Sequence, residues 1–156
     1  MSNNIRNPGF KIIEHPSDTG IAIYAVDIEG LFEIAAEGMF SIICDTKSVG
    51  HELKKSVKLK EASELNFDDL LILWLEKLLY IHETAGILFS KFEIKKLKVG
   101  QGMSVLDADI YGEKIDLKKH EVFISIKAPT YHKLKVSCNA SGKRWSGQVI
   151  FDVWWW

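Results

Sequence analysis

The stretch from Asn66 to Gly86 constrains the fold most, because it carries helix signals at both ends. Asn66 can cap the amino end, Asp68 and Asp69 suit the positive end of a helix dipole, and Gly86 can end the helix. The apolar residues between these ends cover more than one narrow stripe: Phe67, Leu71, Trp74, Leu75, Leu78 and Leu79. The sequence therefore predicts a helix that is buried on more than one side, against a sheet and a neighbouring helix.

Other patterns surround this helix. Residues 21–26 predict a short apolar strand, and Asp27 suits the N-cap of a second helix that runs to about Ile43. The predicted inner face of that helix is Leu31, Phe32, Ala35 and Met39. Residues 55–62 alternate in polarity, which predicts a strand with one face in water.

After Gly86, apolar and polar residues alternate in five further segments, with a turn expected at Pro129. The segments are residues 87–94, 103–111, 121–128, 133–138 and 145–153. They predict antiparallel strands. The order of elements favours an α+β fold, with two helices packed on a mostly antiparallel β-sheet layer in a single compact domain.

Composition agrees with one globular domain, since the 156 residues are 47% hydrophobic and 26% charged. The expected domain spans residues 1–156, with residues 1–9 as a flexible N-terminus and residues 154–156 as a tryptophan tail. The formal net charge of -1 excludes a global positive field that would hold a nucleic-acid backbone. Any RNA contact is therefore expected to be local or to run through a partner.

The two cysteines, Cys44 and Cys138, lie far apart in the sequence, which fits buried thiols in a reducing compartment. The polar start of the chain has no apolar signal region. The most apolar window, residues 70–81, is shorter than the roughly 20 residues that a membrane span needs. We therefore expect a cytoplasmic protein without a membrane contact.

Familiar catalytic signatures are absent from the sequence, including GxGxxG, the Walker loop, HExxH, GxSxG and zinc-type spacing. An enzyme is therefore not the first expectation. Three short stretches nevertheless depart from the pattern of the rest of the chain. They are HPSDTG at residues 15–20, IKAPTYH at residues 126–132 and FDVWWW at residues 151–156.

Two of these stretches contain an acid. Asp18 lies in a Pro/Ser/Gly turn where groups can converge on a ligand, although an ordinary Asx turn has the same composition. Asp152 lies near the end of an apolar strand and would need a cation or a donor if it were buried, whereas an exposed strand end would need neither. Two carboxylates with nearby hydroxyl and carbonyl oxygens suit a hard cation such as Mg, Mn or Ca.

The middle stretch brings together a cation, a hydroxyl, a phenol and an imidazole in Lys127, Thr130, Tyr131 and His132. Such a cluster can bind phosphate or another oxyanion, and the plainer alternative is a solvated strand end. Lysines also recur in two other segments, where interspersed acids favour a solvated sheet face over an RNA track: Lys54, Lys55, Lys58, Lys60, Lys91, Lys95, Lys96 and Lys98. The tail Trp154–Trp156 indicates a core cap or an oligomer contact, so a homo-oligomer is possible.

Five stretches in this order closely resemble the archease family, from about Lys11 to Val153. They are IEHPSDTGI, FDDLLILWLEKLLY, YGEKIDLKKH, IKAPTYHKLKV and VIFDV. The resemblance implies a small, non-enzymatic partner of an RtcB-type RNA ligase in tRNA splicing or RNA repair, which meets RNA through the ligase. Archeases promote transfer of GMP to a histidine of the ligase, allow multiple turnover, can broaden nucleotide use, and carry a metal-binding tip near the ligase active site.

Matching motifs carry the family's roles over to residues of this chain. The two acids of the metal-binding tip become Asp18 and Asp152, and Val153 would add a main-chain or terminal oxygen. The lysine implicated in activation becomes Lys127, with His132 and His15 as further candidates. The chain departs from the family in two places. Pro16-Ser17 replaces the usual Thr-Ala, and Trp154–Trp156 follow Val153, so that Val153 cannot carry a free terminal carboxylate.

Two other function classes stay open on the residues alone. A metal-dependent phosphohydrolase would use the same acids with His132 or His15 as general base, although the sequence offers no third acidic ligand. An RNA-binding or chaperone-like module would use the lysine-rich strands and the tryptophan tail.

Overall fold

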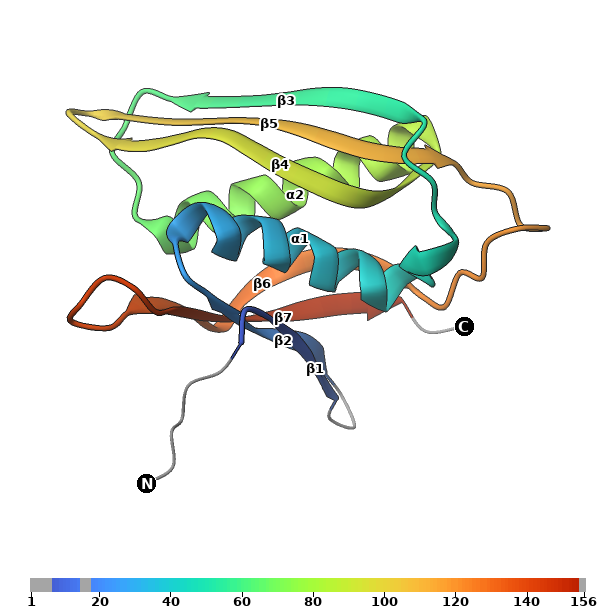
Figure 1. Ribbon diagram of the computed structural model, residues 1–156, viewed down its shortest axis with the longest axis horizontal. Coiled ribbons are helices and arrows are strands. Elements are labelled where there is room, and N and C mark those ends of the chain that lie inside the picture. Colours follow the sequence, from blue (N-terminus) through green and yellow to red (C-terminus); the bar gives the residue numbers. More distant parts are fainter. Residues whose placement is uncertain (1–6, 15–17, 155–156) are drawn as a thin grey trace.

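The strands form two antiparallel sheets, and both helices lie between them (Figure 1). The structure is a computed structural model and describes residues 7–14 and 18–154. One sheet has four strands in the order β1-β2-β7-β6, formed by Gly9–Glu14, Thr19–Ala25, Trp145–Trp154 and Ser125–Cys138. The other has the order β3-β5-β4, formed by Leu53–Glu61, Met103–Lys114 and Ile87–Gly100.

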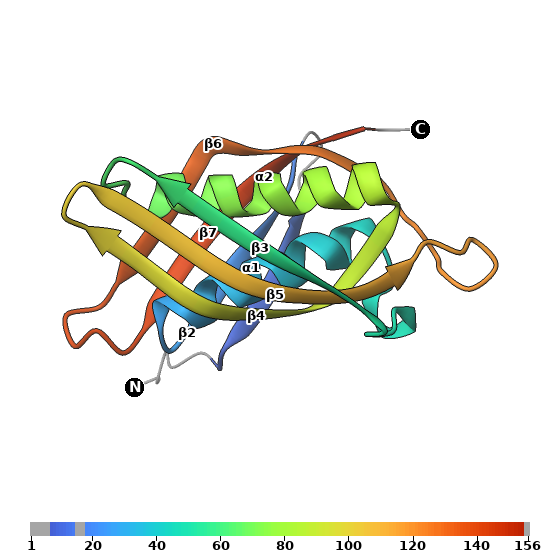
Figure 2. The same cartoon turned by 90° about the horizontal axis from the view of Figure 1, so that it is seen from above.

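Helix α1 (Ile28–Ile43) packs against both sheets, and helix α2 (Phe67–Ala85) packs against β6 and β4. The strands of the three-stranded sheet pass diagonally over the helices (Figure 2). A short 3-10 helix, Thr46–Ser48, follows α1. The α+β class with two helices and antiparallel strands is confirmed. The strands divide into two layers, because each helix has apolar residues on two sides and buries both.

The predicted helix ends are confirmed. Asp27 accepts a hydrogen bond from the Gly30 N–H at 2.7 Å, and Asn66 accepts one from the Asp69 N–H at 2.8 Å. Gly86 ends α2 at φ 65°, a left-handed conformation that glycine adopts without strain. These caps satisfy backbone donors at the helix ends that would otherwise lack partners.

Burial of α2 on more than one side is also confirmed. Trp74 is fully buried, and its indole N–H donates to the Phe32 carbonyl at 2.9 Å, which ties α2 to α1. Seven side chains of α2 are buried: Leu70, Leu71, Ile72, Trp74, Leu75, Leu78 and Leu79. The predicted inner face of α1 is entirely buried: Leu31, Phe32, Ala35 and Met39.

The predicted break at Pro129 is wrong, because β6 runs through this residue from Ser125 to Cys138. Pro129 pairs with Phe151, and β6 is an edge strand of its sheet. An edge strand tolerates proline, since one side of its backbone needs no partner strand. The expected start of that strand at residue 121 is also wrong, because β6 begins at Ser125 and the preceding Val122 is 40% exposed.

The cysteines differ from each other. Cys44 is buried as expected, and burial raises the pKa of its thiol to about 11. Cys138 is exposed, contrary to expectation, because it ends β6 beside the β6–β7 turn. Within the described residues, no helix is long and apolar enough to cross a membrane.

Candidate functional site

A shallow cavity of about 220 Å³ lies at one end of the four-stranded sheet, where β7 approaches the C-terminus (Figure 1). We call it the tip cavity. Its walls are Asp18, Thr130, His132, Ile150, Phe151, Asp152 and Val153. Four of the site residues expected from the sequence therefore meet in one place.

The register between β2 and β7 explains how the two acids come together. Thr19, the first residue of β2, pairs with Phe151. Asp18 precedes Thr19 and Asp152 follows Phe151, so extending the ladder by one step sets the two acids opposite each other. Residues that are directly opposite in an antiparallel pair have Cβ atoms about 5 Å apart. Carboxylates that close repel each other unless a cation lies between them.

Neither acid of the tip cavity has a cationic partner in the described part of the chain. All ion pairs found among the described residues involve other acids: Asp109, Glu93 and Glu113. Asp152 is exposed and Asp18 is half-buried. Their charges are therefore available to a ligand.

A β-bulge places Lys127 next to the tip cavity. Ile126 pairs with Val153 and Ala128 pairs with Asp152, so Lys127 is an extra residue with no partner in the ladder. A bulge bends a strand locally and redirects a side chain. Lys127 is exposed and does not itself line the cavity, but its two neighbours in β6 pair with Val153 and Asp152 of the cavity wall.

Trp154 covers the Lys127 side chain. The Lys127 Nζ atom lies 4.2 Å from the centroid of the Trp154 ring, which is cation–π geometry. Trp154 is 51% exposed, so the expectation that it caps the core is wrong. Successive side chains of β7 point to opposite faces of the sheet, so Val153 packs against the core and Trp154 does not. Residues 155 and 156 lie outside the described part of the chain, as do His15, Pro16 and Ser17.

The expected cluster around residue 130 divides between two places. The Thr130 hydroxyl donates to the Ile150 carbonyl at 2.8 Å, and Thr130 and His132 line the tip cavity. Tyr131 is not a cavity residue. Partial burial and a hydrogen bond with the Asp69 carboxylate raise the pKa of the Tyr131 phenol, so this side chain belongs to the α2 side of β6.

The groups of the tip cavity that can bind a metal ion are two carboxylates, a hydroxyl, an imidazole and main-chain carbonyls. Among the described residues, no three His, Cys, Asp or Glu side chains gather closely enough to hold a metal ion. Two carboxylates with neutral oxygens fit a hard divalent cation whose remaining positions are filled by water or by another molecule. They do not fit a closed zinc site, which has four nitrogen or sulfur ligands.

Sequence reasoning missed the contact between Lys127 and Trp154. Ser125 pairs with Trp154, and Lys127 lies two residues further along β6, at the bulge, with its ammonium group over the tryptophan ring. A bulge shifts the register by one residue and leaves no signature in the alternation of a short strand.

The profile of the Archease protein family (MTH1598/TM1083) matches residues 10–153. The chain belongs to the archease family. The protein archease of Pyrococcus abyssi is 38% identical over 140 residues, which cover 90% of this chain and 95% of that protein. The protein archease of Methanosarcina barkeri is 33% identical over 144 residues, covering 92% and 95%.

A solved structure shares the fold. The solution structure of protein 1598 of Methanobacterium thermoautotrophicum superposes with a TM-score of 0.77 at 34% identity. The alignment covers 92% of this chain and 98% of that one. Family membership, expected from five short stretches of sequence, is therefore confirmed over nearly the whole chain.

Proposed function

We propose that this family member is a non-catalytic accessory protein that activates an RtcB-type RNA ligase during tRNA splicing or RNA repair. The observation that carries the proposal is that Asp18 and Asp152 line the same cavity, where neither has a cationic partner among the described residues. Such a pair is a liability in an isolated protein and becomes useful when a cation and a partner complete it.

Asp18 and Asp152 would hold a hard divalent cation, with Val153 or another main-chain carbonyl of the cavity as a further ligand. A bound Mg, Mn or Ca ion would supply positive charge for the phosphate oxygens of a nucleotide in the ligase active site. The cavity is shallow and ends the sheet, so a second protein can reach its acids without any rearrangement of the core.

Lys127 would contribute a second positive charge beside this cation. Its ammonium group lies over the Trp154 ring, which restricts a long side chain to one side of the bulge. A lysine held in this way loses less conformational entropy when it binds a phosphate. A charge-assisted hydrogen bond from Lys127 to a phosphate oxygen would then favour guanylyl transfer to the ligase histidine.

A phosphohydrolase is less well supported. His132 lies in the cavity and is exposed, but no third acidic side chain joins Asp18 and Asp152 among the described residues. Enzymes that use two metal ions to hydrolyse phosphate esters need more ligands than this cavity provides.

The test is single-turnover transfer of GMP to a partner ligase with GTP and manganese. The wild-type protein is expected to accelerate the transfer, and Asp18→Asn and Asp152→Asn are expected to remove most of the acceleration. Lys127→Ala should reduce it about tenfold or more, since a charge-assisted hydrogen bond contributes roughly 1.5–3 kcal/mol. Asp107→Asn is the matched control, because Asp107 lies on β5 in the other sheet.

The activator role is refuted if wild-type protein leaves the rate of transfer unchanged. The role of the tip cavity is refuted if Asp107→Asn lowers the rate as much as Asp152→Asn does. GTP or phosphate-ester hydrolysis by the protein alone would instead support the phosphohydrolase.

A further inference from the structure

The four-stranded sheet has an outer face that points away from both helices (Figure 1). On β2, Ile21, Ile23 and Ala25 are buried against the core, so the alternate residues Ala22 and Tyr24 face outward. The register sets one outward row across all four strands. This row is Lys11, Ala22, Gln148 and Lys135.

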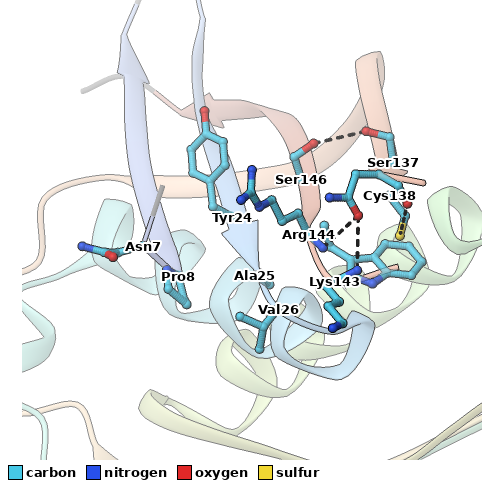
Figure 3. Close-up of a pocket in the computed structure, with 12 residues that line it drawn as sticks. Asn7, Pro8, Tyr24, Ala25, Val26, Ser137, Cys138, Lys143, Arg144 and Ser146 are labelled. Atoms are coloured by element: carbon cyan, nitrogen blue, oxygen red, sulfur yellow. Dashed lines mark hydrogen bonds between the residues drawn. The ribbon is translucent and has the colours of Figure 1, made fainter. Parts of the chain in front are cut away.

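Two adjoining hollows occupy this outer face. The larger, about 470 Å³, lies between the end of β2 and the β6–β7 turn, and its lining includes Tyr24, Lys143 and Arg144 (Figure 3). The smaller, about 260 Å³, continues along β6 and β7. Tyr24 lines both hollows, as do Ser137 and Ser146. Together the two hollows form one groove, which we call the outer groove.

Positive charge is concentrated along the outer groove. Five cationic residues lie in it or beside it: Lys11, Lys133, Lys135, Lys143 and Arg144. No residue that lines either hollow is acidic, and none of the five cations makes an ion pair with a described residue. The whole chain has a net charge of -1, so this face is strongly positive relative to the rest of the molecule.

The other sheet differs in this respect. On its outer face Lys54 pairs with Asp109 at 3.5 Å, and Lys91 and Lys95 pair with Glu93 at 3.9 and 3.6 Å. Lysines there are partly neutralised by an acid of the same strand or of a neighbouring strand. The lysine-rich segments that are conspicuous in the sequence are therefore the weaker candidate for an anionic ligand.

Hydrogen bonds within the β6–β7 turn hold the backbone of its two cationic residues. The Asn139 side-chain oxygen accepts hydrogen bonds from the Lys143 and Arg144 backbone N–H groups, both at 3.2 Å, and from the Ser141 hydroxyl at 3.0 Å. The Asn139 N–H donates to the Arg144 carbonyl at 2.9 Å. These bonds fix the backbone from which both charges project, so less entropy is lost when they bind a ligand.

An aromatic residue of the outer groove suits a nucleobase. Tyr24 lies where the two hollows meet, whereas Trp145 pairs with the buried Ala25 and packs edge-to-face on Phe67 of α2, with ring centroids 5.7 Å apart, at the inner edge of the larger hollow. Aromatic side chains in a cationic groove are the usual platform for unpaired bases. Hydroxyl and amide groups of Ser137, Ser146 and Gln148 line the smaller hollow together with Tyr24 and two lysines, and such groups can form hydrogen bonds with a ribose.

We propose that the outer groove binds a single strand of RNA, with phosphates on the five cations and a base in the larger hollow. A strand of several nucleotides fits better than one nucleotide, because the cations extend over both hollows. An open strand fits better than a duplex, since only an unstacked base can enter the hollow. The proposal rests on the proposed function solely in choosing RNA over DNA.

The outer groove also leads toward the tip cavity. Strand β7 contributes Ser146 and Gln148 to the groove, and Ile150 and Asp152 to the tip cavity, all on alternate positions. The distance from Ser146 to Asp152 along an extended strand is about 20 Å. A strand in the groove would therefore bring its end close to the residues that face the ligase.

The test is fluorescence anisotropy of a labelled RNA of about ten nucleotides, a length within the range that such grooves accommodate. The double variant Lys135→Ala/Arg144→Ala is expected to weaken binding at least tenfold near 0.1 M salt. It should also lower the slope of log affinity against log salt by about 1.4, or roughly 0.7 for each phosphate that is no longer neutralised. Tyr24→Leu should weaken binding about fivefold or more.

The matched control is Lys58→Ala/Lys96→Ala, which removes two exposed lysines from the outer face of the other sheet. It is expected to change binding less than twofold. The proposal is overturned if the wild type does not bind, or if this control weakens binding as much as the Lys135/Arg144 pair. It is also overturned if GMP alone competes as well as the RNA strand, or if DNA of the same sequence binds as tightly.

A second measurement separates this proposal from the proposed function. Guanylyl transfer to the ligase in the absence of RNA should be stimulated equally by wild type and by Lys135→Ala/Arg144→Ala, because the tip cavity is unchanged. A groove variant that stimulates normally and binds RNA poorly supports the proposal. A groove variant that stimulates normally and binds RNA as well as the wild type refutes it and leaves the activator role intact.

Discussion

Binding of a divalent cation should stabilise the protein through Asp18 and Asp152. Extending the β2–β7 ladder by one step sets the two residues opposite each other, both line the tip cavity, and neither has a cationic partner among the described residues. Their repulsion is relieved when a cation binds the folded chain. Asp152→Asn removes half of that charge, so this variant should lose the response to cations without losing stability in their absence.

The size of the effect follows from the number of protein ligands. A site with two carboxylates and open positions belongs to the weak class, with Kd of roughly 10⁻⁴–10⁻³ M. At 10 mM cation, the stabilisation RT ln(1 + [L]/Kd) is about 1.4–2.7 kcal/mol. For a chain of this length each kcal/mol raises Tm by roughly 2–4 °C, so the expected increase is about 3–11 °C.

The assay is thermal unfolding followed by circular dichroism, with calcium, magnesium or manganese chloride against sodium chloride of equal ionic strength. The Tm of Asp152→Asn is expected to rise by less than about 1 °C when the cation is added. The Tm of the control Asp107→Asn should rise by as much as that of the wild type. The reasoning is refuted if the wild type shows no shift with any of the three cations. It is also refuted if Asp152→Asn responds as strongly as the wild type.

Two further predictions concern the fold. Trp74→Phe removes the buried hydrogen bond to the Phe32 carbonyl and part of a fully buried ring. The free energy of unfolding, measured by urea denaturation, should therefore fall by about 2–3 kcal/mol. A loss under about 0.5 kcal/mol would contradict this prediction. Hydrogen bonds from Lys119, the Gly50 N–H and His120 hold the pKa of Glu113 at about 2. Because this pKa is below the unfolded value, the stabilisation is complete above pH 4.5 and is lost as pH falls toward 2. The stability difference between wild type and Glu113→Gln should therefore shrink between pH 5 and 3, and a constant difference would disprove the role of this carboxylate.

Local chemistry in the sequence is sufficient for the helices and for much of the strand pattern. Asp27 and Asn66 can be identified as caps because capping depends on backbone donors within one turn of the helix. The inner face of α1 follows from helical spacing in the same way. The acids of the tip cavity could be identified because Asp18 and Asp152 lie in motifs shared with a family. Each of these features is set by residues that are close together in the chain.

Pairing between distant segments is determined by the tertiary structure. The division into two sheets, the passage of β6 through Pro129 and the bulge at Lys127 depend on strand order and register, which alternating polarity does not specify. The meeting of Asp18 with Asp152 depends on the β2–β7 register in particular. The sequence by itself determined the helices, the antiparallel α+β class and the identity of the acids. Only the folded chain placed the acids in one cavity and gathered scattered cations on one sheet face, because both depend on which strands become neighbours.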